Sequence, residues 1–160
     1  MAGKEENSEN FESIVMPPVN GGVNTVEITF HRKYEVEPIS LDQTQKEEAI
    51  GQEPRPFDID TLLTCFLVKK AGSASIEYNF NPPLEITIIY PEGAWKKAIK
   101  DNYNHPRLAY LGRKGDSWVN GWTEFIKEIT AIIPPDMCGD SEGKIYLTVN
   151  ELPDPLIGGC

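Results

Sequence analysis

The sequence has few cysteines and histidines and no long apolar run. Its 160 residues include 3 cysteines and 2 histidines. Cys65, Cys138 and Cys160 are odd in number and far apart, so they predict neither a disulfide framework nor a zinc site. We therefore expect reduced thiols and a cytoplasmic protein. No stretch of about 18 apolar residues predicts a membrane span, and the first residues lack the apolar core of a signal peptide.

Catalytic motifs are equally scarce. Nucleophilic catalysis needs a serine or cysteine beside a histidine that an acid orients. His31 lies at the end of an expected strand and His105 precedes a proline in a turn sequence, which are ordinary places for structural histidines. Residues 72–76 lack the closing glycine of a nucleophile elbow. We expect no enzyme activity, no cofactor and no bound metal.

The charge balance restricts the class of partner. Asp and Glu number 25 against 15 Lys and Arg, which gives a net charge of −10. Such a surface disfavours a nucleic-acid backbone and an anionic membrane, because both require clusters of Lys and Arg. We expect a protein partner, which could be a second copy of the chain, and neither nucleic acid nor membrane.

Residues 79–90 form the clearest structural pattern. Apolar residues alternate along this stretch with the period of a half-buried strand: Leu84, Ile86, Ile88 and Tyr90. Pro82 and Pro83 cannot donate to a sheet ladder, so we expect the strand to begin there. Turn residues follow at positions 91–93. The rest of the chain is expected to pack around this strand.

Other segments repeat this alternation or apolar composition. Further strands are expected in residues 23–36, 59–69, 75–80, 108–111, 129–133 and 144–149. For residues 123–133 the apolar spacing also fits a helix face, and this alternative stays open. A short helix is expected at residues 94–103, where apolar residues recur at helical spacing.

Two connections are also predicted. Residues 38–56 are polar and charged, so we expect a long surface loop, although residues 43–50 could form two helical turns. Asn120 and Gly121 predict a hairpin turn between Trp118 and Trp122.

The many short expected strands, separated by turn residues, predict an all-β fold, which is an antiparallel sandwich with one short helix. Residues 1–13 are expected to be a disordered acidic tail and residues 14–152 a single sandwich domain. Residues 153–160 are expected to be an extended tail, since Pro153 and Pro155 cannot pair in a sheet.

Four short motifs support a family resemblance. They are Pro83-x-Glu-Ile-x-Ile-x-Tyr90, Leu108-x-Tyr110, Asp116-x-Trp118 and Ile129-Thr130-Ala131-Ile132. In this order they resemble the ZU5/UPA-type modules over about residues 80–135, with the helical insert at 94–103 as a departure. The resemblance implies an Ig-like sandwich and a non-catalytic interaction or regulatory module.

The aromatic residues supply the candidate partner-binding side chains, which are Trp95, Tyr103, Trp118 and Trp122. Large aromatic side chains that reach the surface mark interaction patches. For the tryptophans core packing is the favoured interpretation, and an exposed subset would instead mark a partner-binding patch. For Trp95 we expect packing on the inner face of the helix.

The sequence ends in Leu156-Ile157-Gly158-Gly159-Cys160, which resembles the flexible ends of ubiquitin-like modifiers. The resemblance implies a conjugatable or carrier protein that acts through Gly158, Gly159 and Cys160. The body lacks the strand-strand-helix pattern of a ubiquitin fold. This function is therefore kept as the alternative, and it requires a free tail.

Overall fold

A computed structural model describes residues 10–17, 19, 24–114, 117–136, 141–153 and 156–159. In these ranges the chain forms two antiparallel sheets and two short helices, so the expected all-β class is confirmed. The helices are α2 (Gln43–Ile50) and α3 (Glu92–Lys100). The prediction of a single helix missed α2.

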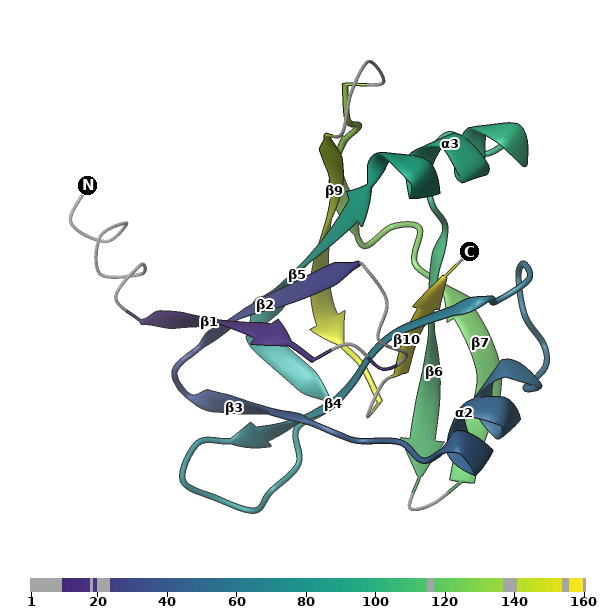
Figure 1. The fold of residues 1–160 in the computed structure, drawn as a ribbon. Helices are drawn as coiled ribbons and strands as arrows, with labels where there is room; N and C mark the ends of the chain where they lie inside the picture. The colour runs from purple at the N-terminus through teal and green to yellow at the C-terminus, as the bar shows by residue number, and fades with distance from the viewer. Residues whose placement is uncertain are drawn as a thin grey trace, which may run out of the picture.

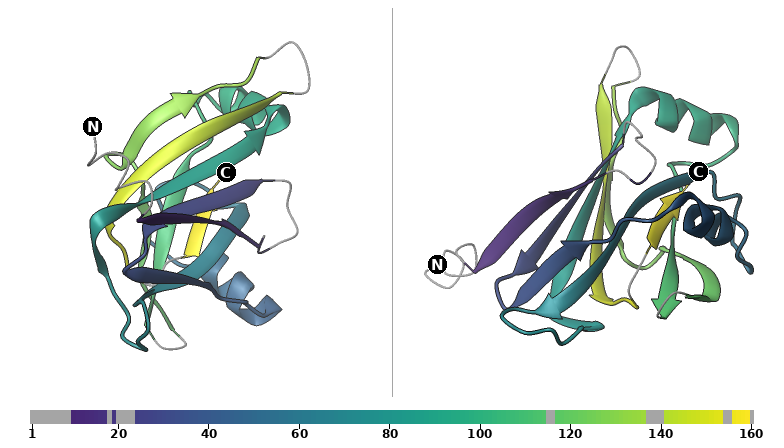
Figure 2. Two further views of the ribbon diagram at one scale, coloured as in Figure 1. Left: turned by 90° about the vertical axis from the view of Figure 1, so that its left-hand side faces the viewer. Right: turned by 60° about the horizontal axis from the view of Figure 1, so that its bottom comes forward.

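Each sheet has five strands, and every neighbouring pair is antiparallel (Figure 1). The first sheet contains, in spatial order, β1 (Phe11–Met16), β2 (Thr25–His31), β5 (Asn79–Pro91), β9 (Glu142–Glu151) and β8 (Ile129–Ile133). The second contains β3 (Tyr34–Pro38), β4 (Thr61–Lys70), β10 (Leu156–Gly159), β6 (Leu108–Lys114) and β7 (Ser117–Glu124). The left view of Figure 2 shows the first sheet from β1 in purple to β8 in light green.

The main core lies between the two sheets and is organised around β5, as predicted. Leu84, Ile86 and Ile88 are fully buried on the inner face of β5. They belong to one cluster with Phe66 of β4 and Leu108 of β6, on the second sheet. The alternation of β5 therefore produces the buried face that was expected from its sequence.

Helix α3 follows β5 at one end of the molecule (Figure 1). Trp95 is 1% exposed and belongs to the main core, which confirms its expected packing role. Its ring makes an edge contact with Tyr90, with the centroids 6.4 Å apart. Ile99, on the same helix, is 55% exposed.

Residues 43–50 form α2, which confirms the alternative of two helical turns and shows that the expected surface loop was wrong over these residues. Asp42 and Gln45 form a capping box, in which the Gln45 N–H donates to Asp42 Oδ1 (2.8 Å) and the Asp42 N–H donates to Gln45 Oε1 (3.0 Å). Ala49 is fully buried in a second cluster with Phe57 and Ile59 on the outer face of the second sheet. A cap and one small buried residue stabilise this helix without an apolar stripe.

The extended tail expected at residues 153–160 is also corrected. Leu156–Gly159 form β10, which lies between β4 and β6 in the middle of the second sheet. Ile157 is fully buried in the main core. The two prolines remove N–H groups only at their own positions, both of which precede this strand. Asp154, Pro155 and Cys160 lie outside the described residues.

Two other predicted boundaries differ from the structure. β1 begins at Phe11, so residues 11–13 belong to the first sheet and not to an acidic tail, while residues 1–9 lie outside the described ranges. Residues 75–80 do not form a separate strand, because only Ile76 bridges to Lys69 before β5 starts.

Asn120 and Gly121 lie inside β7 and not at a hairpin turn. The β6–β7 register passes from Leu111 opposite Trp122 to Gly112 opposite Val119, which leaves these two residues as a bulge. Gly121 has a positive φ of 65°, and a Cβ atom there would lie 2.5 Å from Pro54 Cδ. The Asn-Gly signal therefore marks a bulge that packs against another segment.

Candidate functional site

The described sheets have four edge strands, which are β1, β8, β3 and β7. Only β8, Ile-Thr-Ala-Ile-Ile, has no charged residue among these four. Its strand assignment confirms the preference for a strand over a helix at residues 129–133. Charged side chains on edge strands oppose the addition of another strand. This protection is missing along β8.

β8 is also exposed on both of its faces. Residues 130–133 are all exposed, and the exposed fraction is 38% for Ile132 and 52% for Ile133. The register with β9 shifts between Ile129, opposite Leu147, and Ala131, opposite Tyr146, so Thr130 is an extra residue. Beyond this bulge Ile132 faces the interior side, and Ala131 and Ile133 point to the opposite face by strand alternation.

A groove of about 450 Å³ runs along the interior side of β8. It is lined by His105, Arg107, Glu124, Phe125, Ile126, Ile129 and Ile132. Phe125 is 1% exposed and belongs to the main core, whereas Ile126 is 70% exposed. We call this surface the β8 groove. It offers apolar side chains beside the open strand edge.

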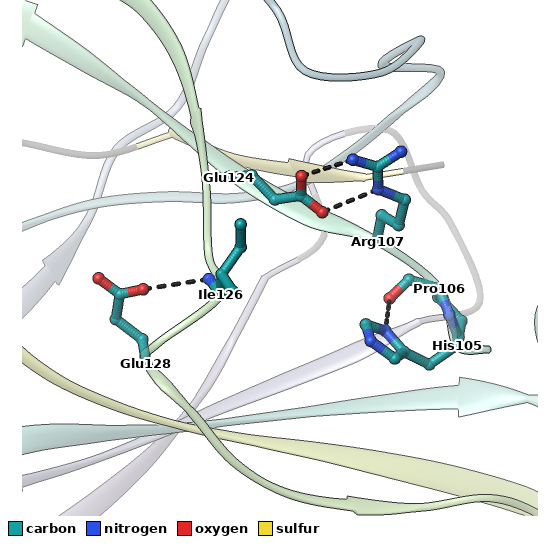
Figure 3. A network of polar contacts seen from close by, with 6 residues as sticks. All are labelled: His105, Pro106, Arg107, Glu124, Ile126 and Glu128. Carbon is teal, nitrogen blue, oxygen red and sulfur yellow. Dashed lines mark hydrogen bonds and ion pairs between the residues drawn. The ribbon is translucent and has the colours of Figure 1, made fainter. Parts of the chain in front are cut away.

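One wall of the β8 groove is an ion pair held in fixed geometry (Figure 3). Arg107 Nε donates to Glu124 Oε2 at 2.8 Å, and Arg107 Nη2 donates to Glu124 Oε1 at 2.5 Å. The guanidinium carbon also lies over the rings of Phe57 and Tyr103, at 4.7 Å and 4.8 Å from their centroids. The hydrogen bond to Glu124 raises the pKa of Arg107, although burial opposes this change.

The other polar groups shown in Figure 3 bond within the protein as well. His105 Nδ1 lies 2.8 Å from the carbonyl oxygen of Pro106, in its own turn. The N–H of Ile126 donates to Glu128 Oε1 at 3.2 Å and fixes the turn before β8. The groove therefore presents a rigid wall with internally satisfied charges and an apolar surface, which suits an apolar side chain.

A second groove of about 450 Å³ opens between β1 and β3 on the other side of the molecule. Its lining includes the carboxylates of Glu12, Glu35 and Glu37. Glu12 pairs with Arg32 at 3.7 Å and Glu37 pairs with Lys69 at 2.7 Å. These edges carry the charged side chains that oppose strand addition, in contrast to β8.

The four aromatic residues predicted to bind a partner do not form one surface. Trp95 and Trp122 are 1% and 3% exposed and lie in different cores, so their burial contradicts a partner-binding role. Trp122 Nε1 donates to the Ala49 carbonyl at 2.9 Å. Trp118 is half-buried against the second core. Tyr103 does not line the β8 groove, but its ring contacts Arg107, which does.

The glycines proposed for conjugation lie within a sheet. Gly158 and Gly159 pair with β4 on one side and β6 on the other. A Cβ atom at Gly158 would lie 3.0 Å from both Trp122 Cη2 and Ile59 Cγ2. The close approach of Trp122 explains the glycine at position 158 without a conjugation role. Cys160 is outside the described residues.

The sequence pattern did not predict that the residues of the β8 groove lie together. Residues 129–133 carry no charge and are followed by Pro134. That pattern predicted a strand, but its place at the edge of the sheet follows only from the order of the strands. Ile126 and Arg107 had no comparable signal, because their positions depend on the packing of the segments around β6 and β7.

No protein-family model matches the chain, and no curated protein or solved structure is significantly similar to it. Within the described residues, no helix has the length and apolar character needed to cross a membrane.

Proposed function

We propose that this protein is a non-catalytic interaction module that binds a protein partner at the edge of β8. The observation that carries the proposal is the exposed, uncharged strand Ile129–Ile133 beside the β8 groove, whose lining combines apolar side chains with the Arg107–Glu124 pair. The outward N–H and C=O groups of an edge strand are hydrogen-bonded most completely by another extended chain. Peptide recognition by strand addition uses this geometry.

The groove specifies the side chain that such a partner would present. An extended segment along β8 directs alternate side chains to the groove side. There they would contact Ile132 and Ile126 above Phe125, while the Arg107–Glu124 pair keeps its internal bonds. The module therefore selects a strand with an apolar residue facing the groove.

The proposal includes the finer fold type and the setting of the protein. An Ig-like, ZU5/UPA-type module is supported by the motif order in residues 80–135 and by the two antiparallel sheets around one core. A cytoplasmic location, and a partner that is neither nucleic acid nor membrane, are supported by the net charge of −10 and the cysteine spacing. Conjugation through Gly158 and Gly159 is not favoured, because both residues lie in β10.

Site-specific photocrosslinking in the native host tests this function. Benzoylphenylalanine replaces Ile126, which is 70% exposed beside β8, or Val15, which is 60% exposed on β1 and serves as a matched control. We expect discrete protein adducts from position 126 and only diffuse background from position 15. Equal adduct patterns at the two positions, or none at position 126, would contradict the proposal.

A further inference from the structure

We propose that the strand received by β8 is β8 of a second copy of this chain, paired antiparallel about a two-fold axis at Ile132. This inference rests on the function proposed above and names the partner of the same site. The five-stranded first sheet of each copy would then join that of the other copy, which gives one continuous sheet of ten strands. Symmetric pairs of this kind are the commonest form of homo-oligomer.

Charge selects β8 for self-pairing. With a net charge of −10 on each copy, two copies repel one another over most of their surfaces. Pairing through β1 or β3 would bring the carboxylate of Glu12, or those of Glu35 and Glu37, from both copies into the interface. Strand β8 carries no charge, and Lys127 and Glu128 just before it are opposite in sign. Salt also screens the remaining repulsion beyond about 8 Å at physiological ionic strength.

The side chains of β8 determine the register. With the axis at Ile132, the small Ala131 of each copy lies opposite the large Ile133 of the other on the outer face. This arrangement fills the space at both positions. With the axis at Ala131, Ile133 would lie opposite Ile129, which the bulge turns to the other face of the strand. That register leaves both residues without an apolar contact and is disfavoured.

The same axis joins the two β8 grooves. Ile132 lines the groove and would lie directly opposite Ile132 of the second copy. The exposed Ile126, at 70%, borders the same space and would be covered from the other side of the axis. A second copy of the chain therefore supplies the extended segment with an apolar side chain that the β8 groove selects. Homodimer interfaces are more apolar than the rest of a protein surface.

The short strand predicts a weak, concentration-dependent dimer. β8 spans 5 residues and is followed by Pro134, which has no N–H to donate across the edge. Interfaces of limited area are typical of transient association. A disulfide bond that can form only in the predicted register is therefore the most direct probe of this dimer.

The experiment compares two variants, one with a cysteine at the axis and one with a cysteine at the neighbouring position. Ile132→Cys and Ala131→Cys are made separately in the full chain carrying Cys138→Ser and Cys160→Ser, with the buried Cys65 retained. In the proposed register the two Cα atoms at position 132 are about 4.5–5.5 Å apart, within reach of a disulfide. The two Cα atoms at position 131 are diagonal, about 7–8 Å apart, and beyond easy reach.

Mild oxidation should give a covalent dimer from Ile132→Cys and at least several-fold less from Ala131→Cys. In the chain with its own cysteines, sedimentation equilibrium should show a dimer that Ile133→Lys abolishes and Val15→Lys leaves unchanged. A dimer trapped equally at both positions, or better at 131, or a chain that stays monomeric without a trap, would overturn the inference. Photocrosslinked adducts from position 126 with a mass other than twice the chain would then retain the proposed function with a different partner.

Discussion

Gly158 lies directly against Trp122, and a Cβ atom at position 158 would be 3.0 Å from Trp122 Cη2. The indole cannot move away freely, because its Nε1 donates to the Ala49 carbonyl. β10 therefore fits between β4 and β6 only with a minimal residue at this position. This contact joins the end of the described chain to the helix α2 that covers the second sheet.

Gly158→Ala should destabilise the protein, by about 1–3 kcal/mol for an overpacked site. The matched control is Gly93→Ala, since a Cβ atom at Gly93 meets nothing within 4 Å. Gly93 lies in α3, where alanine is the better helix former, so the control should be neutral or slightly stabilising. Chemical denaturation measures both variants, and equal effects would mean that β10 does not pack as described.

The wall of the β8 groove gives a second prediction. Arg107→Lys should lower the free energy of unfolding by about 1–3 kcal/mol, because lysine cannot form the paired bonds to Glu124 and lacks the planar group that lies over the two rings. The control Arg32→Lys changes an exposed pair, with side chains 61% and 55% exposed, and should cost less than about 1 kcal/mol. Equal losses for the two substitutions would argue against a structural role for the wall.

The pH dependence of that ion pair follows from the raised pKa of Arg107. A cation whose pKa is higher in the folded state stabilises the fold at every pH below its ordinary value and loses this contribution only as the pH rises past its folded value. The stability difference between the native chain and Arg107→Lys should therefore stay constant from pH 7 to about pH 9, where neither side chain loses its proton. If this stability difference vanished between pH 7 and about pH 9, the Arg107–Glu124 ion pair would not be its source.

The buried Trp95 gives a further prediction. Trp95→Ala should cost about 3–5 kcal/mol, the usual range for a buried large aromatic side chain. Ile99→Ala on the same helix is the control, because Ile99 is 55% exposed, and its effect should stay below about 1 kcal/mol. A small effect of Trp95→Ala in denaturant unfolding would show that α3 is not anchored by this residue.

Helix α2 depends on its N-terminal cap. Asp42→Ala removes the oxygen that accepts from the Gln45 N–H at 2.8 Å, and it should cost about 1 kcal/mol. Asp42→Asn keeps an accepting oxygen and should restore most of the stability, which thermal unfolding can measure. A loss that asparagine does not restore would contradict the capping role.

Sequence patterns predicted those elements whose residues alternate between core and solvent. β5 is the clearest example, since Leu84, Ile86 and Ile88 are buried as their spacing indicated. β10 could not be predicted in this way. It has 4 residues and lies between two strands that are distant in sequence, so its stability comes from tertiary pairing and not from local propensity.

The candidate site likewise combines features that the local sequence predicted with features that depend on tertiary structure. The strand Ile129–Ile133 was expected from its composition, but its position at an edge follows only from the order of the strands. The predicted aromatic residues had the chemistry of a binding surface, yet Trp95 and Trp122 are needed in the two cores. Composition alone cannot distinguish a tryptophan that fills a core from one that meets a partner.

The central claim, that β8 receives a strand from a second copy, is tested most directly by amide hydrogen exchange of the native chain over a series of protein concentrations. Exchange in residues 129–133 should slow as concentration rises, because the outward N–H groups of β8 become hydrogen-bonded. Exchange in β1, the opposite edge of the same sheet, should not change. Exchange in β8 that is independent of concentration, or equal slowing in both edge strands, would contradict the claim.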